Sequence, residues 1–343
     1  MHDYLLILNY LMMKLLCKLL LCATITVGIV ISANAETSYR DNLGDIAGDA
    51  TGDGITDVED VNAIINVILG IVPNPEPKDY SNYDLTGDDK IDVSDVNRLI
   101  NIILGSQEFS SKTYTVNGVS FTMVPVEGGT FTMGATAEQG KEAYDTEKPA
   151  HQVTLSNYSI GETEVTQALW VAVMGENPSI FNDNPQRPVE CVSWDDCQEF
   201  ITKLNQLTGE QFRLPTEAEW EFAARGGNKS RGYKYAGSNN IEEVAWYCNN
   251  VPSQSGDTQP VATKAPNELG LYDMSGNVSE WCQDLWGGYS SEPQTNPTGP
   301  SSGYYCVVRG GCWFFYAQNC RVSYRQNGSP LIAADTLGLR LAL

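Results

Sequence analysis

Two apolar stripes at helical spacing recur 35 residues apart in the front part of the chain. The first consists of Val61, Ile64, Ile65, Ile68 and Leu69, and the second of Val96, Leu99, Ile100, Ile103 and Leu104. Apolar positions at i, i+3, i+4, i+7 and i+8 form one face of an α-helix. The pattern therefore predicts two short amphipathic helices, each ended by a glycine, Gly70 and Gly105.

The pattern beyond residue 112 is mostly irregular, with short helices and strands. Three helices are predicted over 167–174, 194–207 and from Glu217 to the Gly226–Gly227 pair, with N-caps at Thr166, Ser193 and Thr216. Thr216 and Glu219 have the spacing of a capping box. Alternating runs such as "SFTMVPV" and "GLRLAL" predict strands. Residues 112–343, 232 in all, are enough for a substantial core of mixed α+β class.

The pattern of residues 1–35 predicts a secretory signal peptide. They hold an apolar run with Lys14 and Lys18 and end in Ala33-Asn34-Ala35, a small-x-small cleavage pattern. The alternative is an uncleaved membrane anchor. No later segment approaches the ~20 apolar residues of a membrane span, so we expect none after cleavage. The protein is predicted to be secreted, periplasmic or cell-surface.

The net charge of the chain limits the classes of partner that it can bind. The net charge is −22, which excludes nucleic acid because binding it needs a basic face. Residues 41–105 hold 14 acidic against three basic residues. Such a high density of acidic residues indicates disorder, a solvated face or a cation site.

The acidic segment contains a repeated twelve-residue loop, "DATGDGITDVED" and "DLTGDDKIDVSD". Each copy offers side-chain oxygens at positions 1, 3, 5, 9 and 12 and a backbone carbonyl at position 7, a spacing that wraps a loop around calcium. The predicted ligands are Asp49, Thr51, Asp53, Ile55, Asp57 and Asp60 in the first loop, and Asp84, Thr86, Asp88, Lys90, Asp92 and Asp95 in the second. The alternative is a pair of Asp-rich turns without an ion.

These repeats resemble a type I dockerin, over residues 41–105, with two EF-hand-like calcium loops each followed by one helix. The resemblance implies a small all-α module that binds a cohesin module of a partner, often in polysaccharide-degrading systems. The pairs at positions 10 and 11, Val58-Glu59 and Val93-Ser94, depart from the common Ser-Thr pair that the partner reads.

After a linker at 106–112, residues 113–343 resemble the formylglycine-generating enzyme family, also called sulfatase-modifying factor. The motifs are "VPVEGGTFTMG", "ETEVTQALW", "FRLPTEAEWEFAARGG", "GLYDMSGNVSEW", "VVRGG" and "GLRLAL". The resemblance implies a C-type-lectin-like fold with much irregular structure. It also implies a calcium site made by the Asp273 and Glu280 side chains with the Gly276 and Val278 carbonyls. The alternative there is an Asx turn.

The family's enzymes oxidise a substrate cysteine with copper held by two cysteines in a C-x4-C motif. Their places fall here at Phe315 and Cys320, and Cys312 does not restore the spacing. Copper(I) prefers thiolates, so copper is expected only if Cys312 and Cys320 act in an altered geometry. His151 is the one histidine after residue 35, which excludes a site of several histidines. Enzymatic activity stays open.

The segment "RGGCWFFYAQNCR" supplies the candidate ligand-binding residues. They are Trp313, Phe314, Phe315, Tyr316, Arg321 and, just beyond, Arg325. Aromatics after a glycine pair pack in a core or line a cleft, where they stack on arginine or sugar faces. Three functions follow: a non-catalytic domain for a protein or glycan ligand, a sulfatase-activating oxidase, or an accessory part of a polysaccharide-degrading complex.

Overall fold

The structure is a computed structural model that describes residues 48–51, 55–75, 82–85, 90–103, 110–253 and 256–343. The predicted signal peptide 1–35, most of the linker, and the predicted ligands Asp53, Thr86 and Asp88 lie outside the described residues. The chain divides into two units, Met1–Ser106 and Gln107–Leu343. No helix in the described part is long and apolar enough to cross a membrane.

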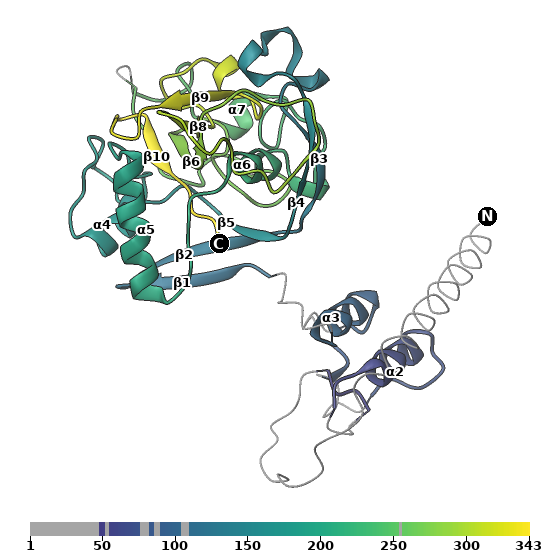
Figure 1. Cartoon of the computed structure of the whole chain (residues 1–343). Coiled ribbons are helices and arrows are strands. Elements are labelled where there is room, and N and C mark those ends of the chain that lie inside the picture. The colour runs from purple at the N-terminus through teal and green to yellow at the C-terminus, as the bar shows by residue number, and fades with distance from the viewer. Residues whose placement is uncertain (1–47, 52–54, 76–81, 86–89, 104–109, 254–255) are drawn as a thin grey trace. The chain divides into compact units, whose positions relative to one another are not determined.

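The N-terminal unit confirms the two predicted helices. They are α2 (Val58–Ile68) and α3 (Val93–Ile103), which pack against each other (Figure 1). Ile64 and Leu99, equivalent positions in the two stripes, are fully buried. Val67 is buried in addition, whereas Leu69 at the end of the predicted stripe is exposed. Each helix thus buries its apolar face on its repeat, as duplicated units of this size require.

The C-terminal unit contains three small sheets (Figure 1). The first has the antiparallel order β1 (Lys112–Val116), β2 (Val119–Val126), β5 (Tyr158–Gly161). In the second, β4 (His151–Leu155) pairs antiparallel with β3 (Gly129–Met133) and parallel with β7 (Gln294–Thr295). The third has the order β10 (Leu337–Leu339), β6 (Ser279–Leu285), β8 (Cys306–Arg309), β9 (Arg325–Gly328), with only β10 and β6 parallel.

The predicted helices of this unit are present with the predicted caps. They are α4 (Gln167–Met174), α5 (Trp194–Thr208) and α6 (Glu217–Ala224), followed by the short α7 (Ile241–Val244). The capping boxes Ser193/Asp196 and Thr216/Glu219 are both formed. Trp194, the first residue of α5, is half-buried.

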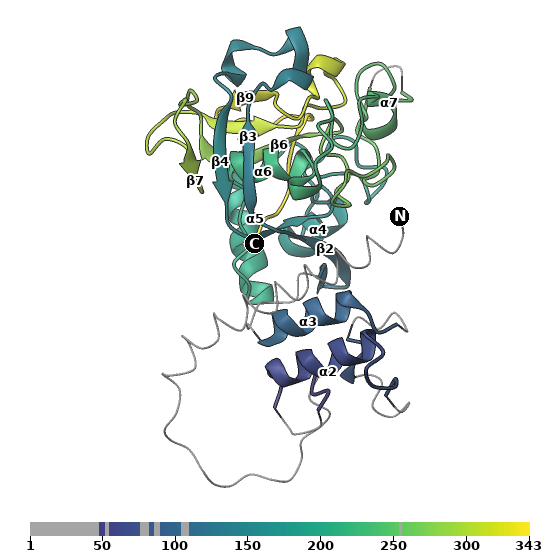
Figure 2. The ribbon, with the colours of Figure 1, turned by 90° about the vertical axis from the view of Figure 1, so that its right-hand side faces the viewer.

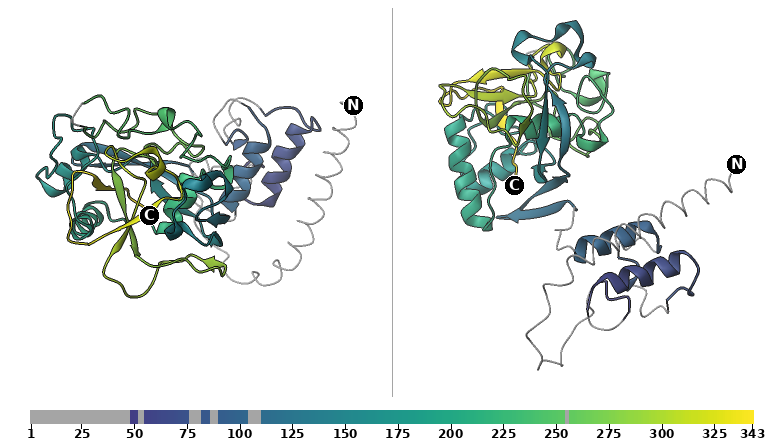
Figure 3. Two further views of the ribbon diagram at one scale, coloured as in Figure 1. Left: turned by 90° about the horizontal axis from the view of Figure 1, so that it is seen from above. Right: turned by 45° about the vertical axis from the view of Figure 1, so that its right-hand side comes forward.

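Two of these helices cover the first sheet on one flank of the unit (Figure 3). Trp170 of α4 and Phe200 of α5 stack with ring centroids 4.9 Å apart and planes 3° apart. Offset aromatic stacking of this kind adds to the free energy of burying the rings. The pair fixes α4 against α5.

Helix α6 lies between the second and third sheets, beside β3 and β4 (Figure 2). Seven of its residues are buried, among them Glu217 and Glu221. Charged side chains are almost never buried unless they are paired. The helix therefore carries two carboxylates into an interior that has to supply cations.

Four buried arginines pair with buried glutamates of this domain, including the two on α6. Each contacts a buried glutamate: Arg309 with Glu221, Arg321 with Glu147, Arg325 with Glu217, and Arg340 with Glu280. All eight side chains are at most 6% exposed. Segments far apart in sequence, among them α6, β8 and β9, are thus joined by buried ion pairs.

Candidate functional site

The aromatic run after β8 divides between the interior and the surface. Trp313 is buried; its Nε1 donates a hydrogen bond to the carbonyl of Asp335 at 3.0 Å, and its ring meets that of Phe181 edge-on. Phe314 and Tyr316 are 64% and 65% exposed. Trp313 therefore packs in the core, whereas Phe314 and Tyr316 lie at the surface.

The two predicted ligand-binding arginines lie inside the domain. Arg321 is fully buried, and its Nη atoms donate to both oxygens of Glu147 at 2.6 and 2.7 Å. Arg325 is 3% exposed and donates to both oxygens of Glu217 at 2.6 Å. Arg321 is therefore an internal ion-pair residue, whereas Arg325 lines a cavity described below.

The thiols of the C-terminal unit are all unpaired. The free cysteines are Cys191, Cys197, Cys248, Cys282, Cys306, Cys312 and Cys320. Cys312 and Cys320 are fully buried, and Cys320 packs in one apolar cluster with Cys248 from a distant loop. The Cys248 N–H also donates to the carbonyl of Phe315 at 3.1 Å. Sequence spacing could not reveal Cys248, because only the folded loops bring it here.

The geometry does not provide the family's copper pair. A phenyl ring stands at position 315, where the first thiol of the motif would lie. Burial raises the pKa of the Cys312 thiol to about 12 and that of Cys320 well above its ordinary value. Thiolate is the form that binds metal and attacks substrates. No group of three His, Cys, Asp or Glu side chains suited to a metal ion occurs among the described residues.

The predicted calcium motif of the C-terminal domain lies in a buried acidic cluster. Asp273 accepts a hydrogen bond from the N–H of Ala262, and its other oxygen has no partner. Glu280 is engaged on both oxygens, by Arg340 and by the indole of Trp220. Calcium binding by Glu280 would require Arg340 to move away.

The backbone of this motif turns tightly, and two of its N–H groups donate hydrogen bonds. Gly276 has φ +85°, and its N–H donates to the carbonyl of Gly310. The Val278 N–H donates to Glu164, a further buried carboxyl that the sequence analysis missed. Burial raises the pKa of Glu164 well above its ordinary value, and the charge of Asp273 adds to the effect. Of the predicted ligands, Glu280 is therefore engaged by Arg340 and Trp220, whereas one oxygen of Asp273 has no partner and the hydrogen bonds at Gly276 and Val278 involve their N–H groups rather than their carbonyls.

The repeated loops of the N-terminal unit are closed by their last residue. Asp60 accepts hydrogen bonds from the N–H groups of Thr51 at 2.9 Å and Asp57 at 2.8 Å. Asp95 accepts from the N–H of Asp92 at 2.8 Å in the second loop. Both closing carboxylates are fully buried. Each loop therefore places its position-12 carboxylate inward, where a calcium ligand has to lie.

The residue at position 1 of each loop is also largely buried. Asp49 and Asp84 are each 9% exposed, whereas Ile55, which would offer a backbone carbonyl, is exposed at its side chain. Lys90 at the same position of the second loop is likewise exposed. Positions 1 and 12 thus lie inside and the position-7 side chains outside, whereas Thr51 at position 3 is exposed.

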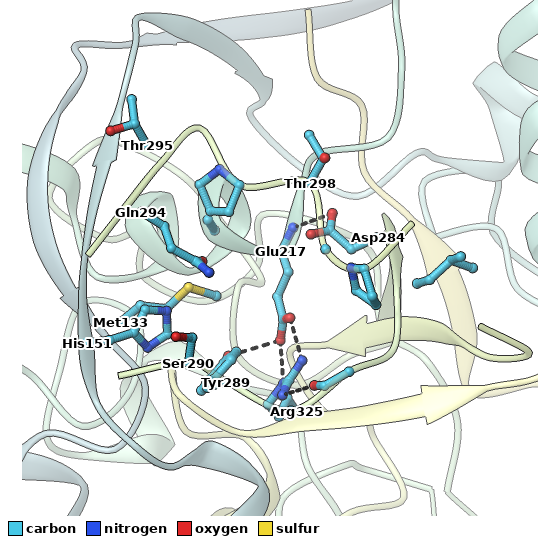
Figure 4. Close-up of a pocket in the computed structure, with 17 residues that line it drawn as sticks. Met133, His151, Glu217, Asp284, Tyr289, Ser290, Gln294, Thr295, Thr298 and Arg325 are labelled. Carbon is cyan, nitrogen blue, oxygen red and sulfur yellow. Dashed lines mark hydrogen bonds and ion pairs between the residues drawn. The ribbon is translucent and has the colours of Figure 1, made fainter. Parts of the chain in front are cut away.

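A cavity of about 580 Å³ opens beside the N-terminal end of α6 (Figure 4). Its floor is formed by Glu217, Asp284 and Arg325, and one wall by Met133 and His151. The loop 287–300 completes the lining with Tyr289, Ser290, Gln294, Thr295 and Thr298; Tyr289 packs on His151, and Gln294 and Thr295 lie on β7 beside β4. The volume falls in the range of about 300–1,000 Å³ that is typical of ligand pockets.

The charged side chains on the floor of the cavity differ in their partners. Arg325 pairs with Glu217 and lies between the rings of Trp286 and Tyr289, 4.1 and 4.0 Å from their centroids. Asp284 accepts the N–H of Glu217 at 3.0 Å. Burial, together with the Glu217 carboxylate, raises the pKa of Asp284 to about 7. No sequence motif marks Asp284 in "WCQDLW" as a functional residue.

Comparison with known proteins agrees with this fold and these motifs. Residues 111–343 match the "Sulfatase-modifying factor enzyme 1-like domain", and residues 47–104 match the "Dockerin type I domain". Formylglycine-generating enzyme of Streptomyces coelicolor is 31% identical over 284 residues, covering 64% of this chain and 88% of that protein. "Chaperone protein LppX" of Paenibacillus barcinonensis is 34% identical over 253 residues, covering 60% and 83%.

A solved structure, Treponema denticola variable protein 1, superposes with a TM-score of 0.60 at 37% identity, covering 68% of this chain and 98% of that one. The chain belongs to the sulfatase-modifying factor enzyme 1-like family and carries a type I dockerin domain N-terminal to the family domain. Both resemblances noted in the sequence are confirmed.

Proposed function

We propose that this is an exported protein whose C-terminal domain binds a protein or glycan ligand without catalysis. The observation that carries the proposal is the loop after β8. It presents Phe314 and Tyr316 to solvent at the place where the family's oxidases need a thiol pair. Exposed aromatic side chains that rim a fixed loop are typical of binding surfaces.

The surroundings of this loop support a binding role. Phe314 and the segment around Phe181 both contact the buried ring of Trp313. Ile180 and Leu331, beside the segments that meet Trp313, are 62% and 76% exposed. Trp313 therefore acts as a rigid support beneath apolar side chains, which favours a protein ligand.

Binding can be tested with a double variant. F314S/Y316S should lose ligands that the wild-type chain captures from a glycan array or from the extracellular proteins of its host. The matched control is Y304S, which alters a tyrosine that is 90% exposed on a different loop. Equal capture by all three proteins would place the binding surface elsewhere.

The rival proposal is a sulfatase-activating oxidase, and the similarity to formylglycine-generating enzymes is the observation that favours it. Incubating the reduced protein with copper and a Cys-x-Pro-x-Arg peptide, followed by mass spectrometry, separates the two. We expect no formylglycine product, because position 315 holds no sulfur. Conversion of the peptide would refute the non-catalytic proposal.

For the dockerin domain we propose calcium binding in both loops, cohesin attachment, and a role as an accessory part of a polysaccharide-degrading complex. The inward carboxylates Asp60 and Asp95 support the first point. Pull-down on cohesins with and without chelator tests the second.

The signal peptide at 1–35 and calcium at Asp273, Gly276, Val278 and Glu280 remain predictions. Edman sequencing of the mature N-terminus tests the former.

A further inference from the structure

The cavity beside α6 contains a buried acid that the fold does not require. Asp284 is 4% exposed, and its structural contact is one hydrogen bond from the N–H of Glu217 to its Oδ2. An asparagine oxygen could accept that bond equally well. No lysine or arginine in the described part of the chain forms an ion pair with Asp284. A buried carboxyl without a cation destabilises the fold, so its presence in a cavity points to a ligand.

The other charges of the cavity are already satisfied. The Nε and Nη2 atoms of Arg325 donate to Glu217, and its Nη1 donates to the carbonyls of Thr146 and Gly287. The Tyr289 hydroxyl also donates to Glu217, at 3.1 Å. Arg325 thus has little capacity left to attract an anion, and the adjacent carboxyls would repel one.

The wall that faces Asp284 is neutral, polar and held in place. Gln294 and Thr295 belong to β7, which pairs with β4. Gly299 has φ +75° and passes so close that a Cβ there would lie 2.9 Å from the Cβ of Asp284. This glycine lets the wall approach the floor, with the amide and hydroxyl groups of Gln294 and Thr298 on the cavity side (Figure 4).

We propose that this cavity binds a neutral, polyhydroxylated ligand, a saccharide unit, through Asp284, Gln294 and Thr298. Vicinal hydroxyl groups donate to a carboxylate and exchange hydrogen bonds with amides and hydroxyls, and they bring no charge that the site would have to neutralise. Met133 and His151, both buried, lie on β3 and β4 of the same sheet as β7 and offer a surface for the less polar face of a sugar ring. The site is separate from the surface formed by Phe314 and Tyr316.

The test is calorimetric titration of the full chain with neutral hexoses, pentoses and their oligomers, beside uronic acids and aliphatic amines. At pH 8, where Asp284 is ionised, a neutral saccharide should bind, and D284N should weaken it about tenfold or more, because a charged hydrogen bond is lost. Q294A should weaken it less. The matched control is E292Q, which changes an exposed acid on the same loop and should leave binding intact.

Three outcomes would overturn the proposal: no neutral saccharide binds, the amine or the uronic acid binds more tightly than any sugar, or D284N binds as the wild type does. Ligand-detected NMR on D284N, with its one-dimensional amide spectrum as a check of folding, separates loss of the site from unfolding. F314S/Y316S should bind the saccharide unchanged, so failure of the recognition surface and failure of this cavity give different results.

Discussion

Asp284 shows what a single residue does to stability in this domain. Its pKa is raised by burial and by Glu217, from about 4 in an unfolded chain to about 7 in the folded one. The folded state therefore holds a proton that the unfolded state releases between these values. The stability that the neutral carboxyl provides is complete below pH 4 and is lost as the pH rises through 7.

D284N should remove this dependence. The free energy of unfolding of the variant, relative to the wild type, should rise by on the order of 4 kcal/mol between pH 4 and pH 8. Urea unfolding at a series of pH values measures the difference, and groups common to both proteins cancel in it. E292Q should show no such trend, since Glu292 is exposed. A constant gap between D284N and the wild type would mean that Asp284 titrates normally.

The buried ion pairs act at the same scale. E147Q leaves Arg321 charged in a fully buried place, so we expect it to destabilise the domain by about 3–5 kcal/mol. K203M breaks the exposed pair of Lys203 with Glu199 and should cost less than about 1 kcal/mol. Chemical denaturation compares the two; similar midpoints would show that Arg321 is solvated or finds another partner.

At the scale of elements, α6 connects local sequence to the site. Its capping box forms as the spacing of Thr216 and Glu219 predicts, and the helix begins at Glu217, the residue that reaches Arg325. The start of the helix is therefore also the floor of the cavity.

T216A should test this connection. Loss of the capping hydroxyl, which accepts the N–H of Glu219 at 3.2 Å, should lower stability by about 1 kcal/mol. It should also weaken saccharide binding, because Asp284 is positioned by the N–H of Glu217. Threonine 202, exposed on α5, provides a control: T202A should leave binding unchanged. Stable protein with normal binding would show that the cap is not needed to hold the floor.

At the scale of the whole molecule, the two units have different sources of stability. Among the described residues of the dockerin domain, the buried apolar side chains are Ile64, Val67 and Leu99. Small domains with little core often depend on metal ions. The larger unit has continuous apolar clusters and buried ion pairs.

Chelation of calcium should therefore unfold one unit only. Scanning calorimetry of the full chain should show two transitions with calcium, and a chelator should abolish or lower the one of the dockerin domain. D60A should have the same effect on the first loop alone. A chelator-induced shift of the larger transition would instead support calcium at Asp273. Two unchanged transitions would contradict calcium dependence altogether.

The sequence by itself determined the two-unit organisation, the repeated loops and the main helices. These features rest on short-range rules: helical periodicity, caps such as Thr216, and oxygen spacing in a loop. Family membership followed from motifs that are contiguous in the chain.

Only the tertiary structure decided which candidates face a ligand. Arg321 carries the same charge whether it lies at the surface or against Glu147, and only folding places Glu147 beside it. Cys248 approaches Phe315, and Asp284 approaches Gly299, through loops that no local pattern relates. Burial and partner choice are long-range properties, and so the cavity at Asp284 became visible only in three dimensions.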